Sequence, residues 1–239
     1  MEAELDNKGE VLTVDGRAAF PFDCANQQPL IPYLKTKSII LITLLIALAA
    51  ISPAGAAGFS RVVIDAGHGG YDRGAYTGLT FEKHLAFDVA RRVEHILQKQ
   101  GVRTTMTRSR DVFVPLSKRA QISNSYRGAI FVSIHFNSAS RTSATGIETF
   151  YHSRNRDSYV LARLVQSAIL YKTGNIDRGV KHRALHVLRY NERPAILVEC
   201  GFITSRSELR KCLSPTYRQR VAEGIAMGVL RYQQGGSRR

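Results

Sequence analysis

The chain has 239 residues, of which 44% are apolar and 22% are charged, and it contains no tryptophan. These fractions lie near the averages of soluble globular proteins, which excludes an intrinsically disordered chain and a polytopic membrane protein. The formal net charge of +15 is concentrated after residue 57, where 30 Lys and Arg stand against 13 Asp and Glu. Such a basic surface favours polyanionic partners, and charge alone does not choose among nucleic acid, anionic lipid and cell-wall polymers.

Residues 39–51 form a run that is apolar except for Thr43, follows Lys35 and Lys37 and precedes the small residues of segment 52–57. This order predicts a secretory signal peptide over about residues 34–57. As a helix the run would span about 20 Å, less than the roughly 30 Å of a bilayer's hydrocarbon core. We therefore expect cleavage near Ala54-Gly55-Ala56, with retention as a membrane anchor as the alternative.

The segment before this run, residues 1–33, is acidic and unlike the start of a signal peptide. One hypothesis is a misassigned start, with initiation at Leu34. We accordingly divide the chain into a presequence at 1–57, a globular domain at 58–234 and a disordered tail at 235–239. Cysteine spacing gives no metal-binding pattern. Within the domain we expect Cys200 and Cys212 to be small buried thiols, with a disulfide between them as the alternative.

Beyond Arg61 short β-branched runs alternate with longer amphipathic stretches, which is typical of an α/β domain. The predicted strands are 61–65, 102–107, 129–135, 146–151 and 195–199. The predicted helices are 82–100, 116–126, 158–172 and 217–232, and Gly101 stands where the first of them should stop. These elements predict a single domain with a mixed, mostly parallel sheet of about five or six strands flanked by helices.

Polar residues that a structural sheet does not need follow three of these strands. His68 follows the first strand in a glycine-rich loop, His135 ends the third, and Glu199 ends the last. Glu82 opens the helix after the glycine-rich loop. Because the carboxyl ends of strands form the ligand crevice of open α/β sheets, we expect these four side chains to converge.

Two imidazoles and a carboxylate are a suitable ligand set for catalytic zinc, with a second carboxylate to accept a proton from the attacking water. The alternative is that these residues have only structural roles. Histidines in loops are often simply hydrogen-bonded, and a Glu in the first turn stabilises a helix through its dipole. The glycine-rich loop at 67–74 has neither the Walker pattern nor the dinucleotide-binding fingerprint.

Four blocks in this order resemble the N-acetylmuramoyl-L-alanine amidase family of zinc hydrolases: Val63-Ile64-Asp65-Ala66-Gly67-His68-Gly69-Gly70-Tyr71-Asp72-Arg73-Gly74, Glu82-Lys83, Ser133-Ile134-His135-Phe136-Asn137-Ser138 and Leu197-Val198-Glu199-Cys200-Gly201-Phe202-Ile203. The resemblance covers about residues 60–232. It implies that His68, Glu82 and His135 bind Zn²⁺ and that Glu199 is the catalytic carboxylate. It also implies hydrolysis of the amide between N-acetylmuramic acid and L-alanine of bacterial peptidoglycan.

Other matched positions are expected to support the fold of the site rather than to contact substrate: Arg108, Arg119, Asn137, Glu148 and the run 178–181. The remaining histidines, which have no motif support, are expected at the surface or in packing: His84, His95, His152, His182 and His186.

With the signal peptide, the resemblance implies a protein exported to the periplasm or cell wall that acts on peptidoglycan, contacts the membrane only transiently and is a monomer. One alternative is a non-catalytic peptidoglycan-binding module with the same fold. The other is a basic nucleic-acid-binding protein, which the export signal and the lack of any nucleic-acid motif disfavour, so we expect no nucleic-acid partner.

Overall fold

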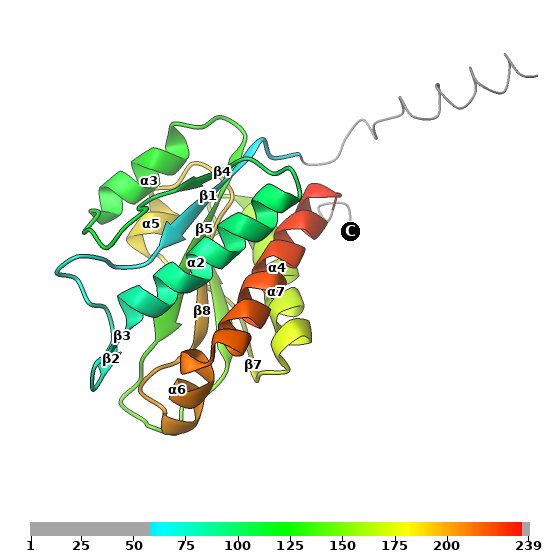
Figure 1. Cartoon of the computed structure of the whole chain (residues 1–239). Helices are drawn as coiled ribbons and strands as arrows, with labels where there is room; N and C mark the ends of the chain where they lie inside the picture. Colours follow the sequence, from blue (N-terminus) through cyan, green and yellow to red (C-terminus); the bar gives the residue numbers. More distant parts are fainter. Residues whose placement is uncertain (1–57, 236–239) are drawn as a thin grey trace, which may run out of the picture. The chain divides into compact units, whose positions relative to one another are not determined.

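The computed structural model describes residues 58–235 (Figure 1). The expected presequence at 1–57 and residues 236–239 of the expected tail lie outside the described residues. Among the helices of the described part, none combines the length and apolarity that a bilayer crossing needs.

A six-stranded sheet forms the centre of the fold, with strand order β4-β1-β5-β8-β6-β7. Neighbouring strands pair in parallel except β6 and β8, which are antiparallel. This confirms the predicted mixed, mostly parallel sheet. Its strands are β1 (Arg61–Ala66), β4 (Thr104–Met106), β5 (Ala129–Asn137), β6 (Ile147–Tyr151), β7 (Asp177–His182) and β8 (Ala195–Phe202), and β2 (Tyr76–Thr77) with β3 (Thr80–Phe81) forms a separate hairpin.

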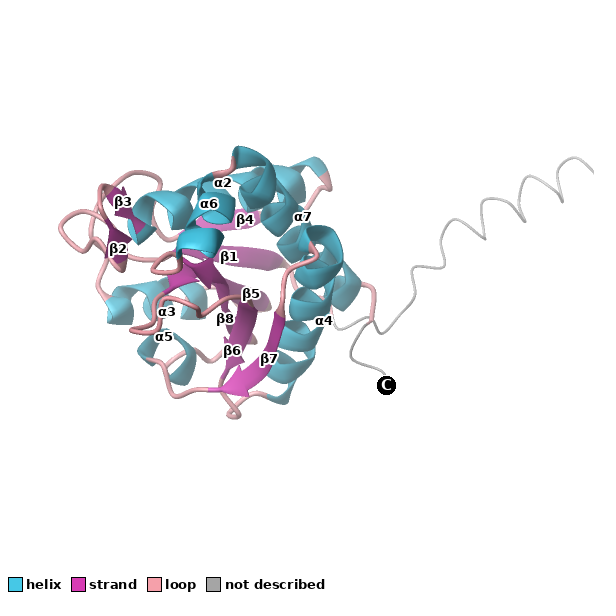
Figure 2. Ribbon diagram, turned by 90° about the horizontal axis from the view of Figure 1, so that it is seen from below, coloured by secondary structure: helices cyan, strands magenta, loops and turns pink. Residues whose placement is uncertain are grey.

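Helices cover both faces of the sheet (Figure 2). On one face lie α2 (Glu82–Lys99), α4 (Arg156–Thr173) and α7 (Pro215–Gln233), whose apolar sides form the larger core with Val62, Ile64 and Ile130. Close packing of α7 on α4 requires a glycine at position 228, because a Cβ there would lie 2.5 Å from the Cα of Val165. The remaining helices are α3 (Leu116–Asn124), α5 (His186–Arg189) and α6 (Arg206–Leu213).

The opposite face of the sheet carries α3 and α5 and a smaller core, in which Val63, Phe131 and Leu197 pack together. Side chains alternate between the faces of a strand, so two residues further along β5 and β8 the chain returns to the same face. His135 and Glu199 therefore continue the rows that contain Phe131 and Leu197. This alternation places the polar ends of both strands on the α3/α5 face.

The structure confirms the main predicted elements and adds some that were not predicted. The predicted strand at 102–107 is shorter, and the edge strand β7, the β2–β3 hairpin and the short helices α5 and α6 were missed. Cys200 and Cys212 are buried free thiols, which confirms that expectation and excludes the alternative disulfide in this structure.

Candidate metal centre

Three of the predicted site residues meet at the carboxyl ends of β1 and β5. His68 follows β1, His135 lies on β5, and Glu82 is the first residue of α2. One potential ligand atom from each lies within 4.8 Å of the others. Nε2 of His68 is 3.1 Å from Oε2 of Glu82, and Nδ1 of His135 is 2.8 Å from Oε1 of the same carboxylate. The cluster joins residues 67 positions apart in the sequence.

Glu82 is buried and held in place by the backbone. Its Oε2 accepts a hydrogen bond from the amide of Ala75 at 2.9 Å, and its Oε1 accepts one from the amide of Phe136 at 3.0 Å. Burial raises the pKa of a carboxyl group, but hydrogen bonds from His135 and His68 and their charges outweigh burial and hold the pKa of Glu82 well below its usual range. The group is therefore a carboxylate, the form that binds a cation.

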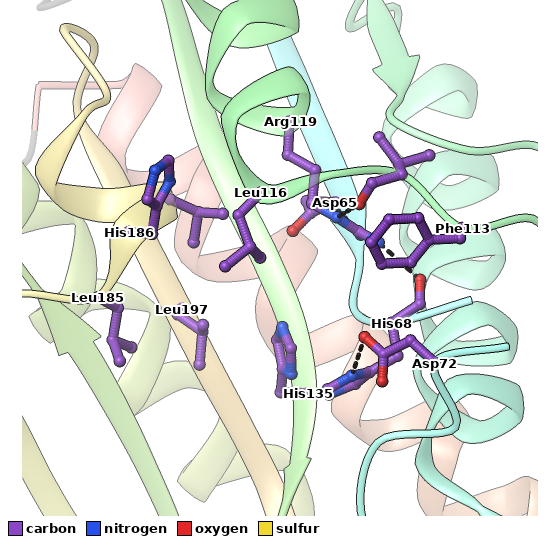
Figure 3. Close-up of a pocket in the computed structure, with 12 residues that line it drawn as sticks. Asp65, His68, Asp72, Phe113, Leu116, Arg119, His135, Leu185, His186 and Leu197 are labelled. Atoms are coloured by element: carbon purple, nitrogen blue, oxygen red, sulfur yellow. Dashed lines mark hydrogen bonds and ion pairs between the residues drawn. The ribbon is translucent and has the colours of Figure 1, made fainter. Parts of the chain in front are cut away.

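His68 is oriented by a second carboxylate, Asp72. Nδ1 of His68 lies 2.9 Å from Oδ2 of Asp72 (Figure 3). This contact leaves Nε2 for Glu82. The backbone of His68 has φ of 58°, a left-handed conformation that is uncommon for a non-glycine residue. Burial lowers the pKa of His68, but the hydrogen bonds and charges of Glu82 and Asp72 raise it above its usual value overall.

The glycine-rich loop approaches β5 so closely that a side chain at position 67 has no space. A Cβ on Gly67 would lie 2.4 Å from Cε1 of His135. Two buried arginines hold this loop through its carbonyl oxygens. Arg108 donates to the carbonyls of Ala66 and Gly67, and Arg119 donates to those of Ala66 and His68. Both arginines therefore support the site as expected.

Glu199 lies beside this cluster on β8, where it is the register partner of His135 on the neighbouring strand. Its Oε2 is buried and has no hydrogen-bond partner among the described residues. Burial, together with the negative charges of Glu82 and Glu148, raises the pKa of Glu199 well above its usual value. Burying a carboxyl oxygen without a hydrogen-bond partner lowers the stability of the fold. Such groups are typical of catalytic and ion-binding sites.

The residues present fit a metal ion. Two imidazole nitrogens and a carboxylate oxygen already converge, and Asp72 and backbone amides orient them as outer partners do in metal sites. A donor set of two His and one Glu suits zinc among the common metals. Glu199 supplies a further carboxyl group near the same point, without being held by another side chain.

A cavity of about 380 Å³ opens next to the cluster on the α3/α5 face. The two histidines among the metal-ligand candidates, His68 and His135, line it together with Leu116, Leu185 and Leu197 (Figure 3). His186, expected only in packing or at the surface, also lines the cavity. The other unassigned histidines are exposed or half-buried: His84, His95, His152 and His182.

Sequence reasoning gave no separate role to Asp72 and did not find the network around Glu148. Glu148 is buried on β6 as the register partner of Glu199. Its carboxylate accepts hydrogen bonds from Asn137 at 2.6 Å, from Arg178 at 3.4 Å and from Lys181.

Comparisons with known proteins agree with this geometry. The chain matches the N-acetylmuramoyl-L-alanine amidase family (Amidase_3) over residues 62–231. It is 38% identical to the uncharacterized protein YqiI of Bacillus subtilis, over 72% of this chain and 84% of that protein. It is 35% identical to the N-acetylmuramoyl-L-alanine amidase LytC of Bacillus subtilis, over 72% of this chain but 35% of LytC, so it spans about a third of that relative's length.

Solved structures show the same fold. The crystal structure of an N-acetylmuramoyl-L-alanine amidase from Clostridium difficile 630 superposes with a TM-score of 0.71 at 38% identity, covering 74% of this chain and 98% of that one. The amidase AmiC2 of Nostoc punctiforme gives 0.70 at 38% identity, covering 73% and 97%. With a family match over most of its length and these neighbours, the chain belongs to the N-acetylmuramoyl-L-alanine amidase family of cell-wall hydrolases.

Proposed function

We propose that this protein is a zinc-dependent enzyme that hydrolyses the amide bond between the lactyl group of N-acetylmuramic acid and L-alanine in peptidoglycan. The convergence of His68, Glu82 and His135 within 4.8 Å carries the proposal. Membership of the amidase family supports the substrate, and the ligand chemistry supports zinc.

Each side chain has a distinct task in this mechanism. His68 through Nε2, His135 through Nδ1 and the Glu82 carboxylate would hold the ion. When bound, zinc polarises a substrate carbonyl and makes water a stronger acid. Glu199 is the general base: its carboxylate accepts a proton from the attacking water and returns it to the nitrogen of the leaving L-alanine. Its unpaired Oε2 is free for this transfer.

We also propose that the enzyme acts outside the cytoplasm as a monomer. The basic, apolar and small-residue order at 34–57 supports export, and the basic domain suits the anionic polymers of a cell wall. N-terminal sequencing of the protein recovered from its native cell tests the cleavage, and sequencing of the uncleaved precursor tests the start at Leu34. A native chain that retains residues 1–57 would contradict cleavage.

The competing function is a peptidoglycan-binding module that has lost catalysis. It predicts a damaged metal cluster or a missing base, whereas His68, Glu82, His135 and Glu199 are all present at the site. This completeness favours the enzyme.

Mass spectrometry of digested peptidoglycan separates the two functions. The full chain should release stem peptides that carry a free amino group on L-alanine. Glu199→Gln should release stem peptide at least about 100-fold more slowly, a chelator-treated sample should release almost none, and zinc should restore activity only to the treated sample. Intact glycan–peptide linkages after incubation with the zinc-loaded wild type, together with retained binding to the wall, would support the module instead.

A further inference from the structure

The cavity beside the metal-ligand candidates is built mainly from apolar side chains. Phe113 and Val114 line it from the segment before α3 and Leu116 from the start of α3, while Leu185 lines it from just before α5 and Val187 from within α5. Because His68 and His135 line the same cavity, the substrate group that occupies it must be bonded directly to the amide under attack. The occupant is therefore one of the two groups joined by that amide, the sugar or the peptide.

Charge distinguishes these two groups. Among the described residues, Arg119 is the one Lys or Arg that lines the cavity, and its guanidinium is already used. It donates to Asp65, to the carbonyls of Ala66 and His68, and to the carbonyl of Val114. Asp72 adds a carboxylate to the lining. A stem peptide carries carboxylates, and this cavity offers them no free cation, whereas an N-acetylated sugar with its lactyl group in amide linkage is uncharged.

Cations lie on the other side of Glu199. Along the sheet, β8 with Glu199 is followed by β6 with Glu148 and then by β7 with Arg178 and Lys181. Both cations pair with Glu148, and a third or more of the Lys181 side chain remains exposed. Two positive groups on one carboxylate leave net positive charge there, so this side suits the anionic peptide and the cavity side is left for the sugar.

An aromatic pair stands at the rim of the cavity. The ring of Tyr71 stacks on that of Phe113 with centroids 4.4 Å apart and planes 28° from parallel. Tyr71 is 78% exposed, so its ring offers apolar surface to solvent. The C–H face of a pyranose ring packs favourably on such surface, because both are apolar while the hydroxyl groups at the sugar edge stay hydrated.

The loop that presents Tyr71 is fixed before any ligand binds. The amide of Gly70 donates to Oδ1 of Asp111 at 2.8 Å, and Nζ of Lys83 donates to the carbonyl of Gly70 at 2.8 Å. Both hydrogen bonds are made by the backbone of Gly70, and the Tyr71 ring stacks on Phe113. A preorganised loop reduces the entropy lost on binding, as a ligand platform requires.

We propose that the Tyr71–Phe113 pair and the adjoining apolar cavity form the subsite for the N-acetylated sugar of the substrate. This inference rests on the proposed amidase function and assigns a direction to the substrate. The glycan lies over the α3 side of the metal cluster, and the peptide lies toward Lys181.

Calorimetric titration with a glycan that carries no peptide tests the subsite. The ligand is the N-acetylglucosamine–N-acetylmuramic acid disaccharide with its lactyl carboxyl capped as a methylamide. Zinc-loaded full chain carrying Glu199→Gln is used throughout so that nothing is cleaved. Adding Tyr71→Ala should weaken binding about tenfold, and adding Tyr71→Phe should leave it nearly unchanged because the ring is kept. Tyr76→Ala is the matched control, since Tyr76 is 66% exposed and lies outside the cavity lining.

Three results would overturn the subsite: equal affinity in Tyr71→Ala and its parent, no measurable binding by the parent, or dependence on Tyr71 of the binding of a free stem peptide. These results differ from failure of the proposed function. In that case the wild type would release no stem peptide from the wall, whatever the titrations showed.

Discussion

Arg119 on α3 donates from Nη1 to Oδ1 of Asp65 at the end of β1, over 2.7 Å and with both side chains almost fully buried. The same guanidinium holds the carbonyl of His68, so the pair connects the sheet to a metal-ligand candidate. Removing one partner of a buried ion pair leaves the other charge without compensation.

We therefore expect Arg119→Met to lower the free energy of unfolding by about 3–5 kcal/mol, measured by urea denaturation of the metal-free chain. Arg92→Met is the matched control. Its ion pair with Asp88 is partly exposed to solvent and Arg92 also donates to Gln219 on α7, so loss of Arg92 should cost only about 1 kcal/mol. Equal losses in the two variants would show that the buried pair has no special role.

Asp65 also makes stability depend on pH. Burial raises the pKa of this carboxyl, but the charge of Arg119 and hydrogen bonds from Ser133 and Thr107 lower it below its usual value overall. A group whose folded pKa is depressed stabilises the fold fully above its unfolded pKa of about 3.9, and loses this contribution as the pH falls through the folded value.

As the pH falls below about 4, the unfolding free energy should therefore fall more steeply in wild type than in Asp65→Asn, by up to about 1.4 kcal/mol per pH unit. Unfolding curves at half-unit pH steps measure this difference. If the unfolding free energies of the two proteins changed with pH in the same way, Asp65 would not be the source of the pH dependence.

Sequence patterns predicted the strands that are buried on both faces, because burial requires apolar residues there. β1, β5 and β8 lie inside the sheet with helices on both faces, so they read as continuous apolar runs. β7 was missed because Asp177–His182 lies at the edge of the sheet and holds charged residues and a glycine in place of such a run. Its pairing with β6 is a tertiary effect that no local pattern records.

The site divides in the same way. His68, Glu82, His135 and Glu199 stand at the ends or starts of predicted elements, so topology alone placed them at one edge. The Asp65–Arg119 contact joins residues 54 positions apart, and the network of Glu148 joins β6 to β7. Side-chain reach decides such contacts, and it follows from packing rather than from spacing.

Asp72 offers a test of the metal site through a residue that is not itself a ligand. Asp72→Asn should weaken zinc affinity by about 10- to 100-fold, because the carboxylate no longer fixes the orientation and basicity of His68. Competition with a zinc-binding dye measures the affinity. Asp111→Asn is the control, since Asp111 braces the same loop at Gly70 but contacts neither His68 nor His135. Similar affinities in wild type and Asp72→Asn would contradict this role.

Glu199 should stabilise the protein less than a neutral residue does, because its buried Oε2 has no hydrogen-bond partner among the described residues. Its folded pKa lies above the unfolded value of about 4.3, since burial disfavours the charged form. For an acid with a raised pKa, stability is lost as the pH rises from the unfolded value toward the folded value. Glu199→Gln keeps the size and shape of the side chain and removes this loss of stability, because glutamine does not ionise.

We therefore expect the metal-free Glu199→Gln chain to be more stable than metal-free wild type at pH 7, while the zinc-loaded variant releases stem peptide about 10²–10⁴-fold more slowly than zinc-loaded wild type. Below about pH 4 the two stabilities should converge. Glu148→Gln is the matched control, because Glu148 is a buried carboxylate on the neighbouring strand but is paired with Lys181, and the same change there should destabilise the chain. A Glu199→Gln chain less stable than wild type at pH 7 would mean that the Glu199 carboxyl has a compensating partner in the folded protein. Its burial would then give no support to a role in proton transfer.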